Sequence, residues 1–261
     1  MANFKSCRSD FKLSVKTLSI VIPAHNEEKT ISEFVSSLSL AMIRISGSGF
    51  LFDYEIIVLD DGSTDKTSSI LREIAHEKTR VIFNSSASGI HRAFLQLYSE
   101  ACMEWILLVP GDAQWPASEI ERLVLYHFKT SPIIPTMTTR RHKTGYSPVR
   151  LFVSSCFGNF AKYFLKSFKQ ADPGSIKILP REVASLNYIC NSVLIEIERM
   201  MYCEENFGKL NQLEVDIVPR IYGSSSTITL KTLRPLLNDC FKMFIFYKLL
   251  RRRLIGRNQV I

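Results

Sequence analysis

The 261-residue sequence lacks several features, and each absence argues against a class of protein. No apolar run approaches the ~20 residues that cross a bilayer, so we expect no membrane span. The six cysteines stand at irregular intervals without a C-x-x-C pair, which argues against a zinc site and favours reduced thiols in a cytoplasmic protein. The first residues, "MANFKSCRSDFKLS", have no apolar core and no small-residue cleavage site, so we expect no signal peptide.

Charge is present but unevenly divided. Residues 1–130 hold 13 Lys and Arg against 16 Asp and Glu, whereas residues 131–261 hold 20 against 9, giving net charges of −3 and +11. A basic second half suggests an anionic partner, such as phosphates or an acidic membrane surface; the alternative is a surface that only keeps the protein soluble. No recognised nucleic-acid-binding module accompanies the basic residues, so we expect no nucleic acid partner.

Short apolar runs alternate with segments of helical periodicity over the first 130 residues. Four runs predict buried strands, at 18–23, 55–60, 80–83 and 105–110. The second half is less regular; its patterns predict strands within 131–140 and at 175–179 and 213–218, and helices at 148–168 and around 181–203. Strand–helix repeats of this length predict an α/β fold with a mostly parallel sheet.

Polar residues follow three of the predicted strands. They are "PAHNEE" after the first strand, "DDGSTD" after the second and "PGDAQ" after the fourth. Each alone is explained by a helix N-cap or an Asp-Gly turn. Together they predict a binding site, because ligands of parallel sheets bind beyond the carboxyl ends of the strands.

The segments "LSIVIPAHNEEKTISEFVSSL", "YEIIVLDDGSTDKT" and "GDAQWP" resemble the family-2 glycosyltransferases of the GT-A fold, up to about residue 120. The resemblance implies an α/β three-layer sandwich with a mostly parallel sheet. It also implies inverting transfer of a sugar from a nucleotide-sugar donor, a UDP- or GDP-sugar. We predict one GT-A domain over residues 1–235 and a basic amphipathic C-terminal tail over residues 236–261.

The same resemblance implies a nucleotide-sugar site. Its residues are Pro23, His25, Glu27, Asp60, Asp61, Ser63, Asp112 and Gln114. Asp112 and Gln114 are expected to hold Mg²⁺ or Mn²⁺ against the diphosphate. Pro110 stands where the family's Asp-x-Asp-x-Gln motif has its first carboxylate. The alternative is therefore a chain that keeps the fold but has lost the metal site.

Four later segments resemble the dolichyl- or polyprenyl-phosphate sugar synthases within that family. They are "TTRRH", "GYSPVRLF", "ADPGSIKILPREV" and "RIYGSSS", and Ser226 stands where the subgroup has a lysine. The resemblance implies that Arg140, Arg150 and Arg220 orient a lipid phosphate acceptor and, with Asp112, form the catalytic set.

No Glu-Asp dipeptide is present, although relatives that glycosylate hydroxyl groups use such an aspartate as a general base. A lipid phosphate carries about 1.5 negative charges near pH 7 and attacks without a base. One alternative is transfer to a saccharide hydroxyl with Asp172 as the base. Another is a non-catalytic protein that binds sugar nucleotides.

The last segment places Phe241, Phe244, Ile245 and Lys248 at helical spacing, and three arginines follow at 251–253. We expect this segment to lie on an anionic membrane, which would make the protein cytoplasmic and peripheral on the inner face. The alternative is an ordinary helix that closes the domain.

Overall fold

Seven strands pair into one sheet in the computed structural model, which describes residues 16–141, 148–165, 174–219 and 230–250. The strands are β1 (Thr17–Ala24), β2 (Asp53–Asp60), β3 (Thr79–Phe83), β4 (Trp105–Leu108), β5 (Thr136–Arg140), β6 (Lys177–Pro180) and β7 (Asn211–Val215). Their order is β3-β2-β1-β4-β6-β5-β7, and only β6 is antiparallel to its neighbours in this described sheet. The prediction of a mostly parallel sheet is confirmed.

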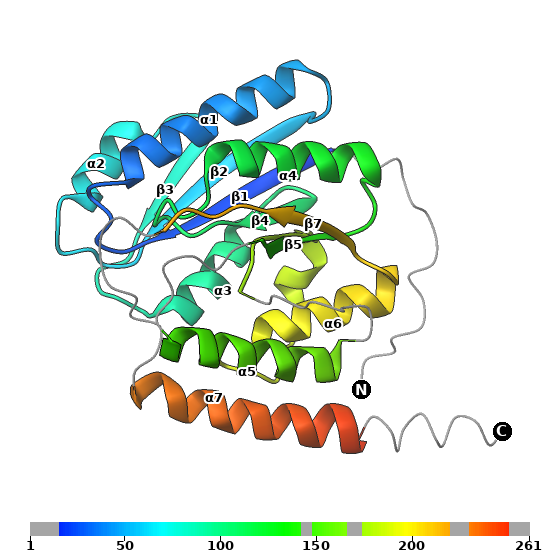
Figure 1. Ribbon diagram of the computed structural model, residues 1–261. Coiled ribbons are helices and arrows are strands. Elements are labelled where there is room, and N and C mark those ends of the chain that lie inside the picture. Colours follow the sequence, from blue (N-terminus) through cyan, green and yellow to red (C-terminus); the bar gives the residue numbers. More distant parts are fainter. Residues whose placement is uncertain (1–15, 142–147, 166–173, 220–229, 251–261) are drawn as a thin grey trace.

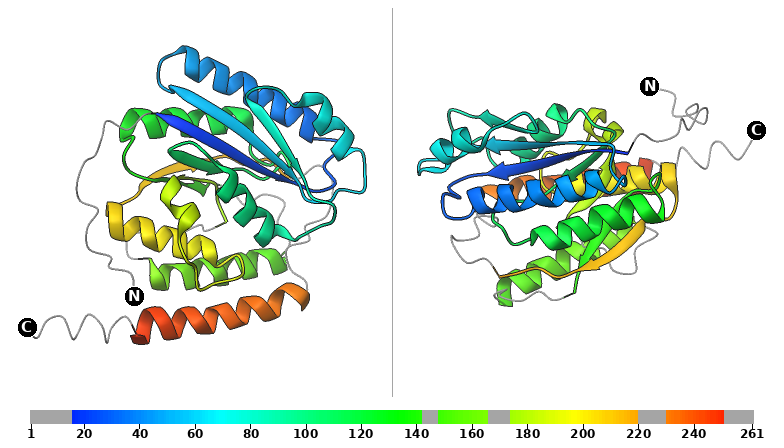
Figure 2. Two further views of the ribbon diagram at one scale, coloured as in Figure 1. Left: turned by 180° about the vertical axis from the view of Figure 1, so that it is seen from behind. Right: turned by 90° about the horizontal axis from the view of Figure 1, so that it is seen from above.

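Helices cover both faces of the sheet (Figures 1 and 2). They are α1 (Ile31–Gly47), α2 (Thr67–Ile74), α3 (Ile90–Glu100), α4 (Ala117–Thr130), α5 (Pro148–Phe164), α6 (Ile195–Phe207) and α7 (Leu230–Met243), with a 3-10 helix η1 (Arg181–Ser185) and a π-helix η2 (Phe244–Leu250). The helices α1, α2 and α4 pack on one face, and α3, α5 and α6 lie on the other; α7 joins the second hydrophobic cluster from the outer side of α5 (Figures 1 and 2). The arrangement is the predicted three-layer α/β sandwich.

The central strands are apolar on both faces because both faces are covered. On β1, Ile20 and Ile22 lie in the core beneath α1 and α4, whereas Val21 lies in the core beneath α3. The same alternation in β2 puts Val58 on the first side and Ile57 on the second. Successive strand side chains point to opposite faces, so a continuous apolar run is the expected pattern for such a strand.

The prediction of a helix around 181–203 is wrong for the first part of that range. The chain there forms η1, then an irregular segment, and α6 begins only at Ile195. Backbone N–H groups that a helix would bond to its own carbonyl groups are bonded to carboxylate side chains in this segment. Glu198 accepts the N–H groups of Ile189 and Cys190. Asp239, from α7, accepts the N–H of Asn191 at 2.7 Å.

The C-terminal helix α7 and the π-helix η2 lie beside α5 (Figures 1 and 2). Asp239 and Met243 of α7 are buried, and the hydroxyl of Tyr247 donates to Glu198 at 2.9 Å. The division at residues 235 and 236 stays a prediction; α7 crosses it as one helix. In the part of the chain that the structure describes, no helix is long and apolar enough to cross a membrane.

Candidate functional site

The loops after β1, β2 and β4 lie together at the carboxyl edge of the sheet. The N–H of Asp61 donates to the carbonyl of Ala24, at the end of β1, at 2.9 Å. The N–H of Gly111 donates to the carbonyl of Pro23 at 3.1 Å, which extends the pairing of β1 with β4 into the loop. Parallel pairing therefore brings the three acid-bearing loops side by side.

The β1 loop is locked to the β2 loop by His25 and Asn26. Nδ1 of His25 lies 3.0 Å from the carbonyl oxygen of Asp61, to which it donates. Asn26 has a left-handed φ of 56°; its N–H donates to Ser63 Oγ, and its side-chain oxygen accepts the N–H of Thr64 at 2.8 Å. Asparagine tolerates this backbone region better than most residues. The hydrogen bonds of His25 and of Ser63 therefore both connect the β1 loop to the β2 loop.

The other predicted residue of the β1 loop is Glu27. Its N–H donates to the hydroxyl of Thr67 at 2.8 Å, and its carbonyl accepts the N–H groups of Thr30 and Ile31 at 3.0 Å. Its backbone therefore leads the chain into α1 while lying against the start of α2.

The two aspartates of the β2 loop have different partners. Asp60 accepts the N–H of Ser63 at 3.0 Å and the hydroxyl of Ser68, so it shapes its own loop. Asp61 instead accepts hydrogen bonds from the loop after β3: from Asn84 Nδ2, from the N–H and hydroxyl of Ser88, and from the N–H of Gly89, all within 3.0 Å.

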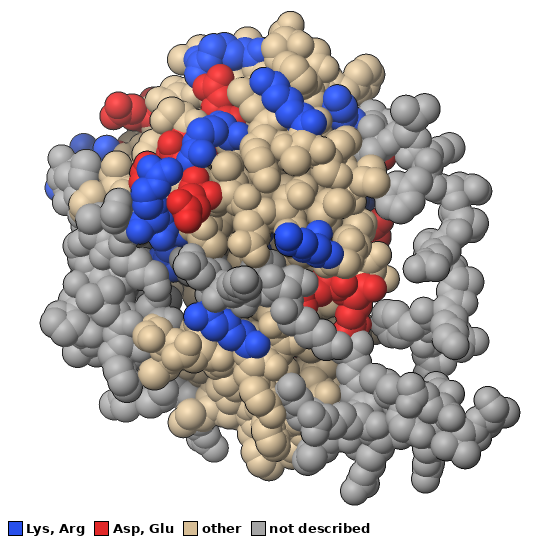
Figure 3. Space-filling view, turned by 45° about the vertical axis from the view of Figure 1, so that its right-hand side comes forward, with Lys and Arg blue, Asp and Glu red and all other residues tan. Residues whose placement is uncertain are grey.

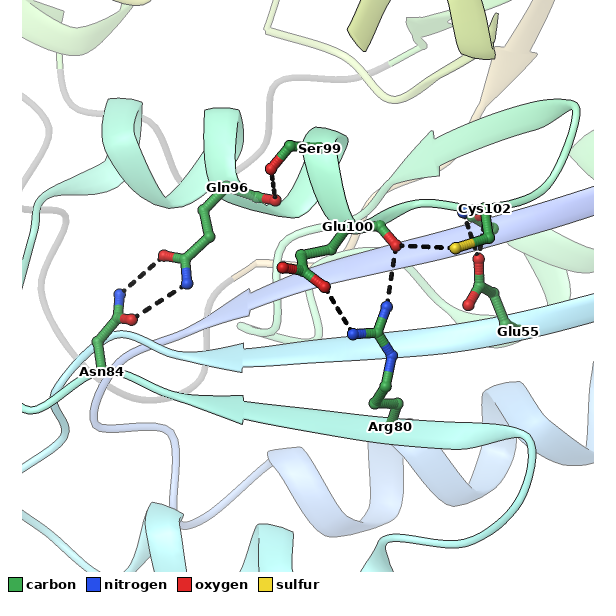
Figure 4. Close-up of polar contacts among 8 residues, drawn as sticks. Glu55, Arg80, Asn84, Gln96, Ser99, Glu100 and Cys102 are labelled. Atoms are coloured by element: carbon green, nitrogen blue, oxygen red, sulfur yellow. Dashed lines mark hydrogen bonds and ion pairs between the residues drawn. The ribbon is translucent and has the colours of Figure 1, made fainter.

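The electrostatics of Asp61 follow from this set of donors. Burial raises the pKa of its carboxyl, and the hydrogen bonds from Asn84, Ser88 and Gly89 lower it by more, so the pKa lies below its usual value. The side-chain amides of Asn84 and Gln96, on α3, exchange two hydrogen bonds that orient Asn84 (Figure 4). Asp61 is therefore held ionised and in one orientation.

Sequence analysis missed the loop after β3. The signal was present as "NSSASG", a polar stretch behind the third strand, but it contains no acid. Gly62 shows how closely the two loops approach, since a Cβ there would come within 2.6 Å of the backbone of Ser86. Gly62 also has a φ of 68°, so this position requires glycine for two reasons.

The Asp112 loop is tightly constrained. A Cβ on Gly111 would lie 3.0 Å from the carbonyl oxygen of Pro23, and Ala113 has a left-handed φ of 54°. Asp112 is 9% exposed, and its Oδ1 accepts the N–H of Gln114 at 3.2 Å. Trp115 is buried in the core beneath α1 and α4 and anchors the far end of the loop.

Asp112 supplies a single carboxylate to any cation bound here. In the described residues, no three His, Cys, Asp or Glu side chains gather where they could hold a metal ion. The absence of a second acid agrees with proline at position 110. These residues do not fit a metal held by protein ligands alone. They do fit a Mg²⁺-type ion bound through one carboxylate and substrate phosphates, a common arrangement.

The predicted acceptor residues fall at the same edge or outside the described residues. Arg140 is the last residue of β5, whose carboxyl end points the same way as that of β4. Arg150 falls in the first turn of α5, where the structure describes the helix but not the side chain. Asp172, Arg220 and Ser226 lie outside the described residues.

In an α/β sheet with acid-bearing loops at its carboxyl edge, a ligand is expected to bind beyond the ends of the parallel strands. The glycosyl transferase family 2 model matches residues 19–184, and the chain belongs to this family. The resemblance seen in the sequence is confirmed: the chain is a glycosyltransferase of the GT-A fold.

Curated relatives match over different lengths. An undecaprenyl-phosphate 4-deoxy-4-formamido-L-arabinose transferase of Pectobacterium carotovorum is 24% identical over 235 residues, covering 84% of this chain and 70% of that protein. A protein of the same name from Edwardsiella ictaluri is 33% identical over 120 residues, 44% of this chain and 35% of its own.

Among solved structures, glucosyl-3-phosphoglycerate synthase of Mycobacterium tuberculosis, in complex with Mn²⁺, UDP-glucose and phosphoglyceric acid, superposes with a TM-score of 0.61. The alignment covers 86% of this chain and 80% of that one, at 20% identity. This similarity supports the fold.

Proposed function

We propose that this glycosyltransferase moves a sugar from a UDP- or GDP-sugar to polyprenyl or dolichyl phosphate at the cytoplasmic face of a membrane. The observation that carries the proposal is the position of Arg140, which ends β5 at the edge where Asp112 follows β4. A phosphate acceptor needs such a cation close to the donor diphosphate. Relatives that match most of this chain are named for undecaprenyl phosphate, which supports the same acceptor.

The donor side of the proposal assigns the nucleoside to the β1 and β2 loops. Oδ2 of Asp61 accepts one hydrogen bond from the described residues, that of Gly89, and a carboxylate oxygen can accept more than one. A nucleobase N–H group is a suitable further donor. Pro23, His25 and Glu27 would line the pocket from the β1 side.

The diphosphate belongs near Asp112 in this proposal. A divalent ion held there by Asp112 and Gln114 would neutralise charge on the leaving diphosphate. Asp112 and Gln114 keep their relative placement because the carboxylate of Asp112 accepts the N–H of Gln114. The left-handed backbone at Ala113 turns the chain between them.

The acceptor step needs no general base. An acceptor phosphate oxygen forms the new bond to the anomeric carbon while the bond from that carbon to the diphosphate breaks. The nucleoside diphosphate leaves with the electron pair, and no proton is removed from the acceptor because it is already ionised. Arg140, with Arg150 and Arg220, would orient the acceptor phosphate; the planar guanidinium matches phosphate oxygens in pairs.

A membrane-facing surface is proposed on α5, α7 and η2. Its exposed apolar side chains are Tyr163, Leu237, Phe241, Phe244 and Phe246, and we call this set the aromatic face. In Figure 3, the lower part of the molecule, where α5 and α7 lie, presents mainly uncharged side chains among the described residues. Aromatic and aliphatic side chains on a surface helix bind the boundary between headgroups and acyl chains.

The test is a donor screen with labelled UDP- and GDP-sugars against undecaprenyl and dolichyl phosphate in vesicles. Label in the lipid fraction that depends on one donor supports the proposal. Label found only in an added saccharide acceptor contradicts it. Binding of sugar nucleotides with no transfer to either acceptor would favour a non-catalytic binding protein.

A further inference from the structure

The chain that leaves β7 is fastened to the Asp112 loop. The N–H of Val218 donates to the carbonyl oxygen of Gln114 at 3.0 Å. Residues 216–219, here called the exit segment, lead directly to Arg220, the proposed acceptor arginine. The backbone of the Asp112 loop and the backbone that leads to Arg220 are therefore one hydrogen bond apart.

Two polar contacts at Asp216 hold the start of the exit segment, one through its backbone and one through its side chain. Glu119, in the first turn of α4, accepts the N–H of Asp216 at 3.3 Å. The carboxylate of Asp216 pairs with Arg141 Nη1 at 2.8 Å. Arg122 ties the same region to α4, because its Nη2 donates to Glu119 and to the carbonyl of Glu214, both at 2.5 Å.

The adjacent arginines of "TTRRH" consequently have different environments. Successive residues of an extended chain point to opposite sides, so the side chains of Arg140 and Arg141 diverge. Arg141 is engaged by Asp216 and, at 3.8 Å, by Glu214. Its N–H also donates to the carbonyl of Val215 at 3.0 Å, which continues the pairing of β5 with β7.

We propose that Arg141, Asp216 and Glu119 are positioning residues that hold the exit segment on the Asp112 loop and so set the distance between the donor diphosphate and the acceptor phosphate. This inference rests on the proposed function. The ion pair is half exposed, with side-chain exposures of 47% and 49%. Such a pair adds little to stability. A small displacement of reacting groups nonetheless lowers the rate strongly, by about 100-fold for 1 Å.

The expected signature is a larger change in the acceptor step than in donor binding. His25 and Asp61, which the proposal assigns to the nucleoside, have no hydrogen bond or ion pair with the three positioning residues in the described part of the chain. Breaking the Arg141–Asp216 pair should raise the acceptor KM and lower kcat while changing the donor Kd much less, because the nucleoside contacts stay intact.

The experiment compares Asp216→Asn with a matched control, Glu100→Gln. Glu100 pairs with Arg80 at 2.6 Å with exposures of 40% and 44%, close to those of the Asp216 pair (Figure 4). We expect Asp216→Asn to lower transfer to polyprenyl phosphate by about 10-fold. Glu100→Gln should not, and both variants should melt at the same temperature. Arg141→Lys should give an intermediate rate, because it keeps the charge but not the planar guanidinium. Equal transfer rates for Asp216→Asn and Glu100→Gln would overturn the proposal.

Amide hydrogen exchange separates this proposal from the proposed function. Asp216→Asn should speed exchange in peptides covering both 214–219 and 110–116, since the two share the Val218–Gln114 bond. If the unsubstituted protein transfers no sugar to polyprenyl phosphate, the proposed function fails. Hydrogen exchange then still tests whether the exit segment is coupled to the Asp112 loop. Unchanged exchange over 110–116 would overturn that coupling.

Discussion

The proposed donor half and the proposed acceptor half of the site are built in different ways. The loops after β2 and β3 are joined by four partly buried hydrogen bonds that end on the carboxylate of Asp61. The loop after β1 is joined to the loop after β2 by exposed hydrogen bonds of Asn26. The described acceptor side depends on half-exposed ion pairs such as Arg141–Asp216. The loops of the proposed donor side are therefore held by many hydrogen bonds, whereas the described part of the proposed acceptor side is held by ion pairs between side chains.

The difference follows from the sheet. On the donor side, β3, β2, β1 and β4 are adjacent and parallel, so their loops emerge next to each other. On the acceptor side, β6 runs the opposite way between β4 and β5 and separates their carboxyl ends. One strand, β6, therefore lies between β4, which leads to Asp112, and β5, which ends at Arg140.

The largest effect is expected at the junction of the two halves. Asp112→Ala should lower transfer by about 100-fold or more, because it removes the only carboxylate of its loop, which would hold the divalent ion that neutralises the leaving diphosphate. Asp112→Asn keeps an oxygen that can accept the N–H of Gln114 but removes the charge. Rates for both variants over a Mn²⁺ titration are the measurement. Unchanged turnover in Asp112→Ala would exclude the role assigned to Asp112.

A change within the donor half should leave the acceptor step unaffected. Asp61→Asn removes the charge and turns an NH₂ group toward backbone donors, at a cost of about 1–3 kcal/mol of unfolding free energy. We expect a weaker donor Kd by calorimetry and an unchanged acceptor KM. A raised acceptor KM with normal donor binding would contradict the division between the halves.

The lowered pKa of Asp61 predicts that the free energy of unfolding depends on pH. The folded-state pKa of Asp61 lies below its unfolded value of about 4. Its contribution is therefore present above pH 4 and is lost as the pH falls through the folded-state pKa. Urea unfolding between pH 6 and pH 3 should show a smaller loss of stability for Asp61→Asn than for the unsubstituted protein. Parallel curves for the two proteins would contradict the prediction.

A change within the acceptor half should have the opposite kinetic signature. Arg140→Lys keeps the positive charge but loses the planar donor pair, so we expect the acceptor KM to rise by about 10-fold with the donor Kd unchanged. Arg80→Lys, in a surface ion pair on β3, is the control. Steady-state kinetics with varied polyprenyl phosphate is the measurement. Equal acceptor KM values for the two variants would show that Arg140 does not bind the acceptor phosphate.

Much of the donor half could be predicted from sequence because its signals are local. Each apolar run is one parallel strand, and the acids that follow it must lie at the carboxyl edge. The roles of Asn84 and Ser88 could not be predicted, since they depend on the pairing of β2 with β3 and on the tight approach at Gly62. Likewise, no local pattern links Glu119 to Asp216, which are joined only when β7 pairs beside β5.

The irregular segment before α6 shows the same limit. Its residues predict a helix by periodicity, yet Glu198 and Asp239 accept three of its backbone N–H groups. Both carboxylates are buried, and Asp239 belongs to α7 and lies 48 residues after Asn191 in the chain. Tertiary hydrogen bonds of this kind override local helix propensity.

The smallest effect on sugar transfer is expected on the aromatic face, outside both proposed halves of the site. Leu237 and Phe241 are 61% and 65% exposed and lie one turn apart on α7. Replacing both by serine should weaken binding to anionic vesicles by about 10-fold, because apolar side chains supply much of the binding energy at such an interface. Transfer to a short-chain, water-soluble acceptor phosphate should not change.

Phe52→Ser is the matched control. Phe52 is 77% exposed in the loop between α1 and β2, and this loop lies across the molecule from α7 (Figure 1). Vesicle sedimentation of the three proteins is the measurement, and equal binding would show that α7 does not contact the membrane.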